Sequence, residues 1–356
     1  MVFFHHQNQT NIYHLPTFLF DICKELHVGV TVFFVLSGFL ITYRYYQSVT
    51  ISKHWLRKYL INRVARIYPM YLLLTACALL FQYIYMHEQP GTFTIFANLF
   101  LLKGFFNNLK FSGIAQSWSL TVEECFYFTA PLIFLFQKKT RKCFLLVFII
   151  LGLGFLLVQV NNFPSVYGFM ENDKFMLVYT FFGRCFEFFI GIYLAIFLKN
   201  KSIQPAKNRS VLFTLTGITS FSVVLILMAI IASAFNVKFS IYSYHGIFLN
   251  NIILPLTIAV TFYGLITEQS LVKRILGWPL FQLLGKSSYI FYLVHLGFLS
   301  TIIELIFPIS NVYINVLVLF ISLNLVSILL YKLAEEPLRV LIKKIFLPHT
   351  LEMIKK

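Results

Sequence analysis

Charged residues are scarce in this chain: they make up 12% of its 356 residues, whereas soluble domains contain about 25%. Hydrophobic residues make up 59%. This composition excludes a water-soluble globule, so the chain has to be surrounded by lipid. Acidic residues are the scarcest, with 13 Asp and Glu against 29 Lys and Arg. Because no basic, aromatic domain accompanies the net charge of +16, we attribute it to membrane topology and anionic lipid headgroups and not to nucleic acid.

Cysteine and the common ligand-binding motifs are also rare or absent. The five cysteines are an odd number without a Cys-X-X-Cys spacing, and most lie in or beside apolar stretches, which predicts small packing residues. A thiol nucleophile at Cys125, beside Glu124, is the alternative. The sequence has no Walker motif, no dinucleotide fingerprint and no His-Glu-X-X-His. These absences argue against a P-loop NTPase and a zinc protease, and no metal site is predicted.

Long apolar stretches dominate what the chain does contain. Nine approach the roughly 20 residues needed to cross a bilayer. A tenth, 93–106, contains Lys103 and Gly104, so we expect an interfacial or re-entrant segment. The prediction is an all-α, polytopic transmembrane helix bundle in which residues 1–356 form a single membrane-embedded domain without a soluble domain. The nine predicted spans are 28–46, 68–86, 118–136, 143–160, 176–198, 211–235, 246–267, 287–307 and 312–333.

Basic residues alternate along the connections between these spans. Of the 29 Lys and Arg, 23 lie in every second connection. Cationic loops stay on the cytoplasmic side, so this pattern predicts a multi-pass protein of the cytoplasmic membrane with its C-terminus in the cytoplasm. The basic connections are 44–66, 137–143, 199–210, 268–286 and the residues after 331.

The beginning of the chain resembles the end of a severed helix. An apolar tetrapeptide, 1–4, runs directly into His5 and His6 and then into a polar segment, 7–10. No basic start and no apolar core of a signal peptide are present. We therefore expect an N-terminally truncated first span. A complete one would restore ten spans with both ends in the cytoplasm.

Ionisable groups inside the spans are candidates for function, because each costs about 2.5–3.5 kcal/mol to insert. Arg184 and Glu187 are three residues apart on one helical face and can neutralise each other, which a structural pair would also do. Glu123 and Glu124 point in different directions around their helix, so at most one faces the bundle interior. His295 lies about halfway along its predicted span, where a packing role is the alternative.

Two cations near a basic connection form a candidate anion site. Arg63 and Arg66 are three residues apart, so a helix that Pro69 bends or restarts presents both on one face. Two guanidinium groups on one face can hold phosphates through paired hydrogen bonds. The alternative is ordinary anchoring of a cytoplasmic span end.

Five ordered segments, covering nearly the whole chain, resemble the acyltransferase 3 family of integral-membrane O-acyltransferases, which acylate sugars in bacterial envelopes. Each segment is weak alone, and the ordered set is specific. The resemblance implies about ten transmembrane helices. The segments are 4–6, 29–41, 63–69, 118–123 with Phe126 and Tyr127, and 285–295 followed by 335–337.

The resemblance also implies a reaction. The donor is an acyl-CoA from the cytoplasm, a co-substrate and not a bound cofactor, and the acceptor is a carbohydrate, commonly on the far side. The family's essential histidine matches His5, with His6 as the alternate. We expect His5 to be the general base toward a sugar hydroxyl, because neutral imidazole accepts a proton near pH 7, and Arg63 and Arg66 to hold the donor phosphates. An Arg that the family carries ahead of the histidine has no counterpart, because the chain has not begun there.

Other polar residues receive supporting roles. Glu123 would orient the imidazole or bind the acceptor, and the Arg184 and Glu187 pair would stabilise developing charge. Ser37, beside Gly38, is expected to permit close helix packing. The remaining polar candidates are Trp118, Glu335 and His295.

Two rival classes stay open. A glycolipid or polysaccharide-precursor transporter, or flippase, would also place an Arg, a Glu and a His in a polytopic bundle, although no inverted repeat is evident. An inactive, truncated membrane scaffold is the third possibility. For an enzyme, the bilayer core of about 30 Å requires that a donor at Arg63 reach deep into the bundle, or that the acyl group be relayed, before it meets an acceptor near His5.

Overall fold

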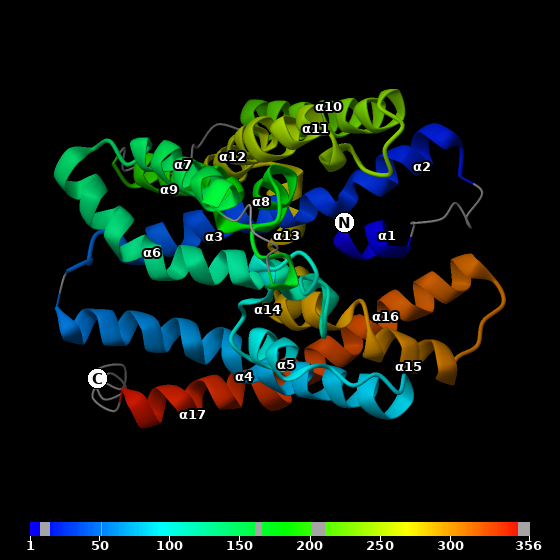
Figure 1. Cartoon of the computed structure of the whole chain (residues 1–356). Coiled ribbons are helices and arrows are strands. Elements are labelled where there is room, and N and C mark those ends of the chain that lie inside the picture. The colour runs from blue at the N-terminus through cyan, green and yellow to red at the C-terminus, as the bar shows by residue number, and fades with distance from the viewer. Residues whose placement is uncertain (8–14, 51, 161–165, 201–210, 348–356) are drawn as a thin grey trace. The chain divides into compact units, whose positions relative to one another are not determined.

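The computed structural model describes residues 1–7, 15–50, 52–160, 166–200 and 211–347 (Figure 1). Within these ranges every regular element is a helix, and the single β-bridge joins Phe106 and Phe169. The predicted all-α fold is confirmed. The predicted polar run at 8–10 and the basic residues of 201–210 lie outside the described residues.

Seven helices in the described part of the chain are long and apolar enough to span a membrane, or eight if a bent pair counts as one. The bent pair, bent by 91°, replaces the predicted continuous span 287–307. The predicted span 143–160 is a helix of 16 residues, which is short for a bilayer core. The predicted count of nine is therefore not confirmed. The seven helices are Thr17–Tyr45, Lys53–Tyr85, Ala115–Thr140, Asp173–Asn200, Leu212–Ala234, Tyr244–Thr267 and Val312–Phe346.

Two compact units divide the chain. Unit 1 comprises Met1–Gln47, Gly104–Asn108 and Trp118–Trp278, and unit 2 comprises Ser48–Lys103, Leu109–Ser117 and Pro279–Lys356. Both contain helices long enough to span a membrane. The helices of unit 1 are α1 (Val2–Gln7), α2 (Thr17–Lys24), α3 (Gly29–Tyr45), α6 (Trp118–Thr140), α7 (Leu145–Val160), α8 (Asp173–Tyr179), α9 (Phe181–Asn200), α10 (Leu212–Ala234), α11 (Tyr244–Phe248), α12 (Leu254–Thr267) and α13 (Leu271–Leu276). Shorter helical turns are η1 (Glu25–Val28), η4 (Val166–Gly168), η5 (Ser240–Tyr242) and the π-helix η6 (Leu249–Ile253).

Helices α3 and α9 of unit 1 approach closely because glycines face the partner backbone. A Cβ atom at Gly38 would lie 2.2 Å from the carbonyl oxygen of Phe188, and one at Gly191 would lie 2.1 Å from that of Val35. Only glycine tolerates such an approach, as in other small-residue helix contacts in membranes. The close packing predicted beside Ser37 is present in the structure.

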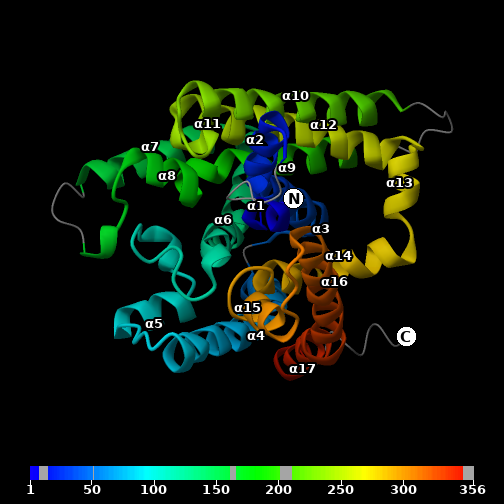
Figure 2. The same ribbon diagram turned by 90° about the vertical axis from the view of Figure 1, so that its right-hand side faces the viewer.

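Helices α10 and α12 form the second tight pair of unit 1 and run side by side in Figure 2. Cβ atoms at Gly217 and Gly264 would lie 2.5 Å and 2.4 Å from the backbone nitrogens of Thr261 and Thr214. At the end of α12, the Glu268 carboxylate accepts hydrogen bonds from the first backbone N–H groups of α10, at 2.8 Å. This carboxylate caps donors that have no partner within the helix.

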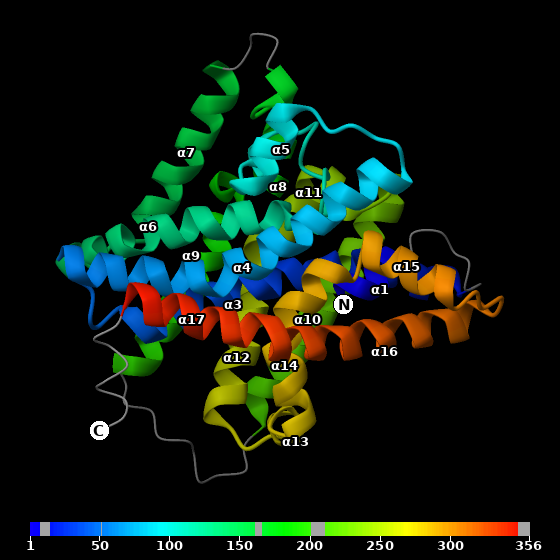
Figure 3. The same cartoon turned by 90° about the horizontal axis from the view of Figure 1, so that it is seen from below.

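Unit 2 is built on one long helix. Ser52 caps its start by accepting a hydrogen bond from the backbone N–H of Trp55 at 3.2 Å. The helix then continues through Pro69, so the proline does not restart it. Helices α4 and α17 lie side by side (Figure 3). The elements of unit 2 are α4 (Lys53–Tyr85), α5 (Thr92–Leu99), η3 (Ala115–Ser117), α14 (Pro279–Val294), α15 (Phe298–Ile306), α16 (Val312–Leu330), the π-helix η7 (Tyr331–Glu335) and α17 (Glu336–Phe346), and η2 (Lys103–Phe105) begins at its edge.

The segment 93–106 forms no membrane-spanning helix, in line with its prediction. It contains most of the eight-residue α5 and the turn η2. The fully buried Lys103 amine donates to the carbonyl oxygens of Ser112 and Ile114 at 2.5 Å and 2.6 Å. These bonds hold the chain between α5 and η3 in a compact loop.

The break between α14 and α15 has a local cause. Gly297 has a φ of 109°, a conformation that favours glycine and that ends the helix. The Gln116 side-chain amide donates to the carbonyl oxygens of Tyr292 and Leu293, both at 2.8 Å. It therefore satisfies acceptors that the end of a helix leaves without partners.

Candidate functional site

His5 is buried at the end of α1, with 6% of its surface exposed. Its Nδ1 atom lies 2.5 Å from the backbone carbonyl oxygen of Lys24. A carbonyl oxygen only accepts hydrogen bonds, so this geometry assigns the ring hydrogen to Nδ1. The lone pair is then on Nε2, which makes His5 chemically suited to accept a proton. The ring of His6, the alternate candidate, lies against it, with the two centroids 4.9 Å apart.

Two further ionisable residues, which the sequence analysis missed, lie next to His5. The His27 ring centroid is 5.5 Å from that of His5. Glu25, which is completely buried, approaches Nδ1 of His27 to 3.8 Å through Oε2. The only sequence signal for these residues was their spacing, two apart, and their place just ahead of Gly29, which begins α3.

Arg184 and Glu187 form a fully buried ion pair within α9, as their spacing predicted. The guanidinium Nη2 lies 2.7 Å from the Glu187 carboxylate, and Nε lies 2.9 and 3.0 Å from its two oxygens. The same guanidinium also donates to the hydroxyl of Thr31 on α3, at 2.9 Å, and to the backbone carbonyl of Val178, at 3.2 Å. The pair is therefore also a link between α3, α8 and α9.

Two asparagines extend this network into the π-helix η6. The Thr31 hydroxyl donates to Asn250 at 3.2 Å, and Asn250 donates to Asn251 at 2.8 Å. Asn251 in turn donates to the carbonyl oxygens of Leu177 and Gly183. Asn250 and Asn251 were not predicted as candidates, although two adjacent asparagines in an otherwise apolar span indicate a buried polar contact. π-helical turns recur at functional sites.

Glu123, on α6, belongs to a different cluster from His5. Its Oε1 accepts hydrogen bonds from the hydroxyls of Ser37 and Tyr127. Glu124 points elsewhere and is buried, as expected for consecutive helical residues. The described contacts thus give Glu123 no direct part in orienting the imidazole. Trp118, which begins α6, packs edge-on against Tyr179 with ring centroids 4.9 Å apart.

The candidate anion-binding residues all belong to unit 2. Arg63 is buried and Arg66 is exposed on the same helix, α4, so their burial differs more than a shared face predicts. Glu335, in η7, is 4% exposed, and its Oε2 has no hydrogen-bond partner in the described part of the chain. Arg66 and Arg339 interact electrostatically with this carboxyl. The region combines an accessible cation with a buried carboxylate.

His295 does not lie halfway along a continuous span. It follows the last residue of α14 and precedes the bend. It is buried, and its Nδ1 lies 2.7 Å from the carbonyl oxygen of Tyr292. This contact resembles that of His5, but it lies in unit 2 beside the Gln116 cap.

The remaining candidate groups are clustered metal ligands and free thiols. In the ranges that the structure describes, no group of three or more His, Cys, Asp or Glu side chains could hold a metal ion. All five cysteines are free thiols, and Cys125, the alternative nucleophile, is partly buried on α6.

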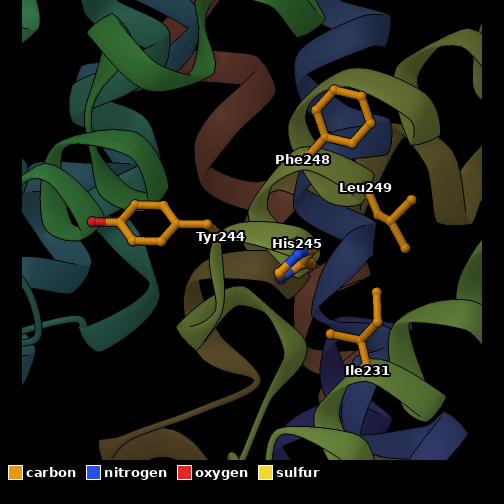
Figure 4. Close-up of a pocket in the computed structure, with 5 residues that line it drawn as sticks. All are labelled: Ile231, Tyr244, His245, Phe248 and Leu249. Atoms are coloured by element: carbon orange, nitrogen blue, oxygen red, sulfur yellow. The ribbon is translucent and has the colours of Figure 1, made fainter.

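An open pocket of about 310 Å³ lies in unit 1, and none of the residues predicted as candidates lines it (Figure 4). Its lining is almost entirely apolar, and its imidazole, His245, stacks on Phe235 with centroids 4.9 Å apart. Such a lining fits hydrocarbon better than a sugar. The residues that line it are Ile231, Tyr244, His245, Phe248 and Leu249.

Comparison with known proteins gives a consistent result. A family model described as an acyltransferase domain matches residues 1–332. Peptidoglycan O-acetyltransferase OatA of Listeria monocytogenes is 27% identical over 303 residues, which cover 80% of this chain and 46% of that protein. O-acetyltransferase OatA of Staphylococcus aureus is 26% identical over 296 residues, which cover 75% and 45%. The chain thus spans about half the length of these relatives. No solved structure matches it.

Proposed function

We propose that this chain, which belongs to the acyltransferase 3 family, is an integral-membrane O-acetyltransferase. It transfers an acetyl group from cytoplasmic acetyl-CoA to a hydroxyl of a carbohydrate in the cell envelope. Family membership over residues 1–332 and the names of the two relatives support the acetyl transfer. A cell-wall glycan is the acceptor that the Listeria relative's name suggests. The observation that carries the proposal is the geometry of His5.

The acceptor side of the reaction depends on His5. Its Nδ1–H group donates to the Lys24 carbonyl oxygen, and the nitrogen and oxygen are 2.5 Å apart. Nε2 is therefore left as the proton acceptor. As the sugar hydroxyl loses its proton to Nε2, its oxygen forms the ester bond and the thioester C–S bond breaks. The proton finally neutralises the CoA thiolate, so the products are the acetylated sugar and CoA. General base catalysis of this kind contributes about 10²–10⁴-fold.

The donor side depends on unit 2. Acetyl-CoA carries several phosphate charges, and guanidinium groups bind phosphates through charge-assisted, paired hydrogen bonds. Exposed Arg66 is accessible for this contact, and the buried Arg63 on the same helix would complete it. In the proposed orientation, the basic connections and the C-terminus are cytoplasmic, which places these cations on the side of the donor.

The remaining predicted residues would hold the helices of unit 1 together. The Arg184 and Glu187 pair is bonded within the protein and would hold α9 against α3. Glu123, bonded to Ser37 and Tyr127, would fix α6 to α3 and remain available to an acceptor through its partly exposed surface. These roles do not require either group to touch the transferred acetyl group.

The test is acetyl transfer itself. Membranes that contain the wild-type chain or the His5→Ala variant receive acetyl-CoA labelled in the acetyl group, and label in envelope polysaccharide is measured. We expect labelling with the wild type and a loss of at least about 10²-fold with His5→Ala. Equal labelling would remove His5 from the mechanism. Movement of glycolipid across the membrane without consumption of any acyl-CoA would establish the transporter alternative instead.

A further inference from the structure

Glu25 is an unusual residue for the interior of a membrane protein. No part of it is exposed, and its two carboxylate oxygens accept hydrogen bonds from the Ser240 backbone N–H, at 2.9 Å, and the Ser240 hydroxyl, at 2.6 Å. Hydrogen bonds from two donors favour the ionised carboxylate. A buried negative charge is expensive unless a positive charge accompanies it. Glu25 therefore suits a site where positive charge develops.

His27 is the group next to this carboxylate. Its Nδ1 lies 3.8 Å from Oε2 of Glu25, and its ring packs against His5 and Phe239, with centroid distances of 5.5 Å and 6.2 Å. Both ring nitrogens are buried, and neither makes a hydrogen bond of normal length and angle among the residues that the structure describes, although the Lys24 backbone interacts with the ring. A buried nitrogen without a good hydrogen bond destabilises the folded protein. Such a cost needs an explanation, and function is one.

The cluster is built from three elements that meet within unit 1. His5 lies in the last turn of α1, Glu25 and His27 lie in η1, and Ser240 begins η5. Phe239 packs on both imidazoles, with its centroid 5.0 Å from that of His5, and keeps this side of the cluster apolar. In apolar surroundings an interaction between charges is stronger than in water.

We propose that Glu25 and His27 are positioning residues for the proposed base: Glu25 stabilises the positive charge that His5 acquires, and His27 shares the proton. This inference rests on the proposed function. When Nε2 of His5 takes the proton of the acceptor hydroxyl, the cluster changes from one negative charge to a neutral pair of carboxylate and imidazolium. Two adjacent imidazoles beside one carboxylate titrate as one unit, in which the second proton binds at a higher cost than the first. The proton leaves when the CoA thiolate is neutralised.

The other charged groups around the cluster do not supply this compensation. Lys24 is paired with Asp21, at 2.8 Å, and the cations Lys238 and Arg184 oppose a second positive charge at His5 and His27, respectively. His6 contributes a ring contact to His5. Among the described groups that face the two imidazoles, Glu25 is the carboxylate placed to offset their charge.

The first experiment compares Glu25→Gln with the wild type in steady-state acetyl transfer. We expect kcat to fall by about 10²-fold, KM for acetyl-CoA to stay within about twofold, and the acid limb of the kcat–pH profile to move to lower pH by about one unit, because a destabilised imidazolium makes a weaker base. Glu25→Asp should recover part of kcat. His27→Gln should lower kcat by about tenfold.

Glu268→Gln is the matched control. Glu268 is also buried in unit 1 and accepts hydrogen bonds from Phe213 and Thr214, including two backbone N–H groups at 2.8 Å. Its substitution disturbs packing as much as that of Glu25 but should leave the kcat–pH profile in place. A profile that moves equally in both variants, or in neither, overturns the assignment.

A second measurement does not depend on turnover. Nitrogen-15 spectra of histidine-labelled protein are recorded against pH, and His5→Gln and His27→Gln identify the two resonances. We expect the two rings to share one titration, with a midpoint that falls by about one unit in Glu25→Gln. An unchanged midpoint overturns the inference even if the wild type acetylates sugar. A shifted midpoint in a protein that transfers no acetyl group would overturn the proposed function and leave the pairing intact.

Discussion

Three buried carboxylates of unit 1 differ from the buried carboxylate of Glu335 in unit 2 in how fully they are hydrogen-bonded. In unit 1, Glu25, Glu187 and Glu268 each accept at least two described hydrogen bonds. In unit 2, the buried carboxylate of Glu335 has an oxygen without a hydrogen-bond partner among the described residues, and Arg66 interacts with it from an exposed position. A satisfied polar network stabilises one arrangement of helices, whereas incompletely satisfied groups are available to a ligand. We infer that these three carboxylates brace the helices of unit 1, whereas Glu335 and Arg66 belong to a surface of unit 2 that can bind a ligand.

The largest expected effect concerns the framework of unit 1. Arg184→Met leaves the Glu187 carboxylate buried without its counter-ion, so we expect the free energy of unfolding to fall by about 3–5 kcal/mol. The matched control is Glu336→Gln in unit 2, which keeps Arg339 beside Glu335 and breaks only the Arg339 and Glu336 pair, 3.6 Å apart and solvent-accessible. Its loss should cost less than about 1 kcal/mol. Denaturation in detergent measures both, and similar losses would contradict the contrast between the units.

The next effect tests the close approach of α3 and α9. Gly38→Ala places a methyl group 2.2 Å from a backbone oxygen of Phe188, which cannot move aside as a side chain can. We expect a loss of about 2–3 kcal/mol in the free energy of unfolding. Gly152→Ala in α7 is the control, because its Cβ would meet nothing within 4 Å. That variant should be as stable as the wild type or slightly more so, and a comparable loss there would remove the packing explanation.

A smaller effect tests the binding surface of unit 2. Arg66→Ala should raise KM for acetyl-CoA by about tenfold, equivalent to about 1.4 kcal/mol, and leave the melting temperature unchanged because Arg66 is exposed. Arg57→Ala removes another exposed cation from α4 and should change neither quantity. If Arg66→Ala lowers the melting temperature without changing KM, Arg66 stabilises the fold and does not bind the donor. The charged groups of unit 2 would then have the same bracing role as those of unit 1.

The smallest expected effect is on how the melting temperature depends on pH. Burial lowers the pKa of the Lys103 amine well below 10.5. Between the lowered pKa and 10.5, the unfolded chain binds a proton that the folded chain does not, so stability rises with pH in this window. We therefore expect the melting temperature of the wild type to rise relative to that of Lys103→Met between pH 7 and pH 9.5. If the melting temperatures of the two proteins change with pH in parallel, the buried amine keeps its proton.

Local spacing predicted several features of the structure correctly. Arg184 and Glu187 pair because side chains three residues apart share one face of a helix, and Gly38 permits close packing wherever α3 meets another helix. The separation of Glu123 from Glu124 follows from the same geometry. Each of these predictions needs only the shape of an isolated helix.

Other features could not be predicted because they depend on residues far apart in the chain. The carbonyl that holds His5 belongs to Lys24, and the donors that satisfy Glu25 belong to Ser240. The partner that Glu123 has on α3, Ser37, is likewise far from it in the chain. The break after His295 looked like continuous helix, because apolar composition does not reveal a glycine with positive φ.

The sequence by itself determined that this chain is a bundle of apolar helices, because residues without charge have to be buried in lipid and their backbones have to bond internally. It also determined which polar residues interrupt the apolar stretches. Tertiary structure alone decided their partners: which carbonyl holds the imidazole, which carboxylate lies beside it, and which cation stays accessible. Those choices depend on how helices far apart in sequence pack, and helical periodicity carries no information about that.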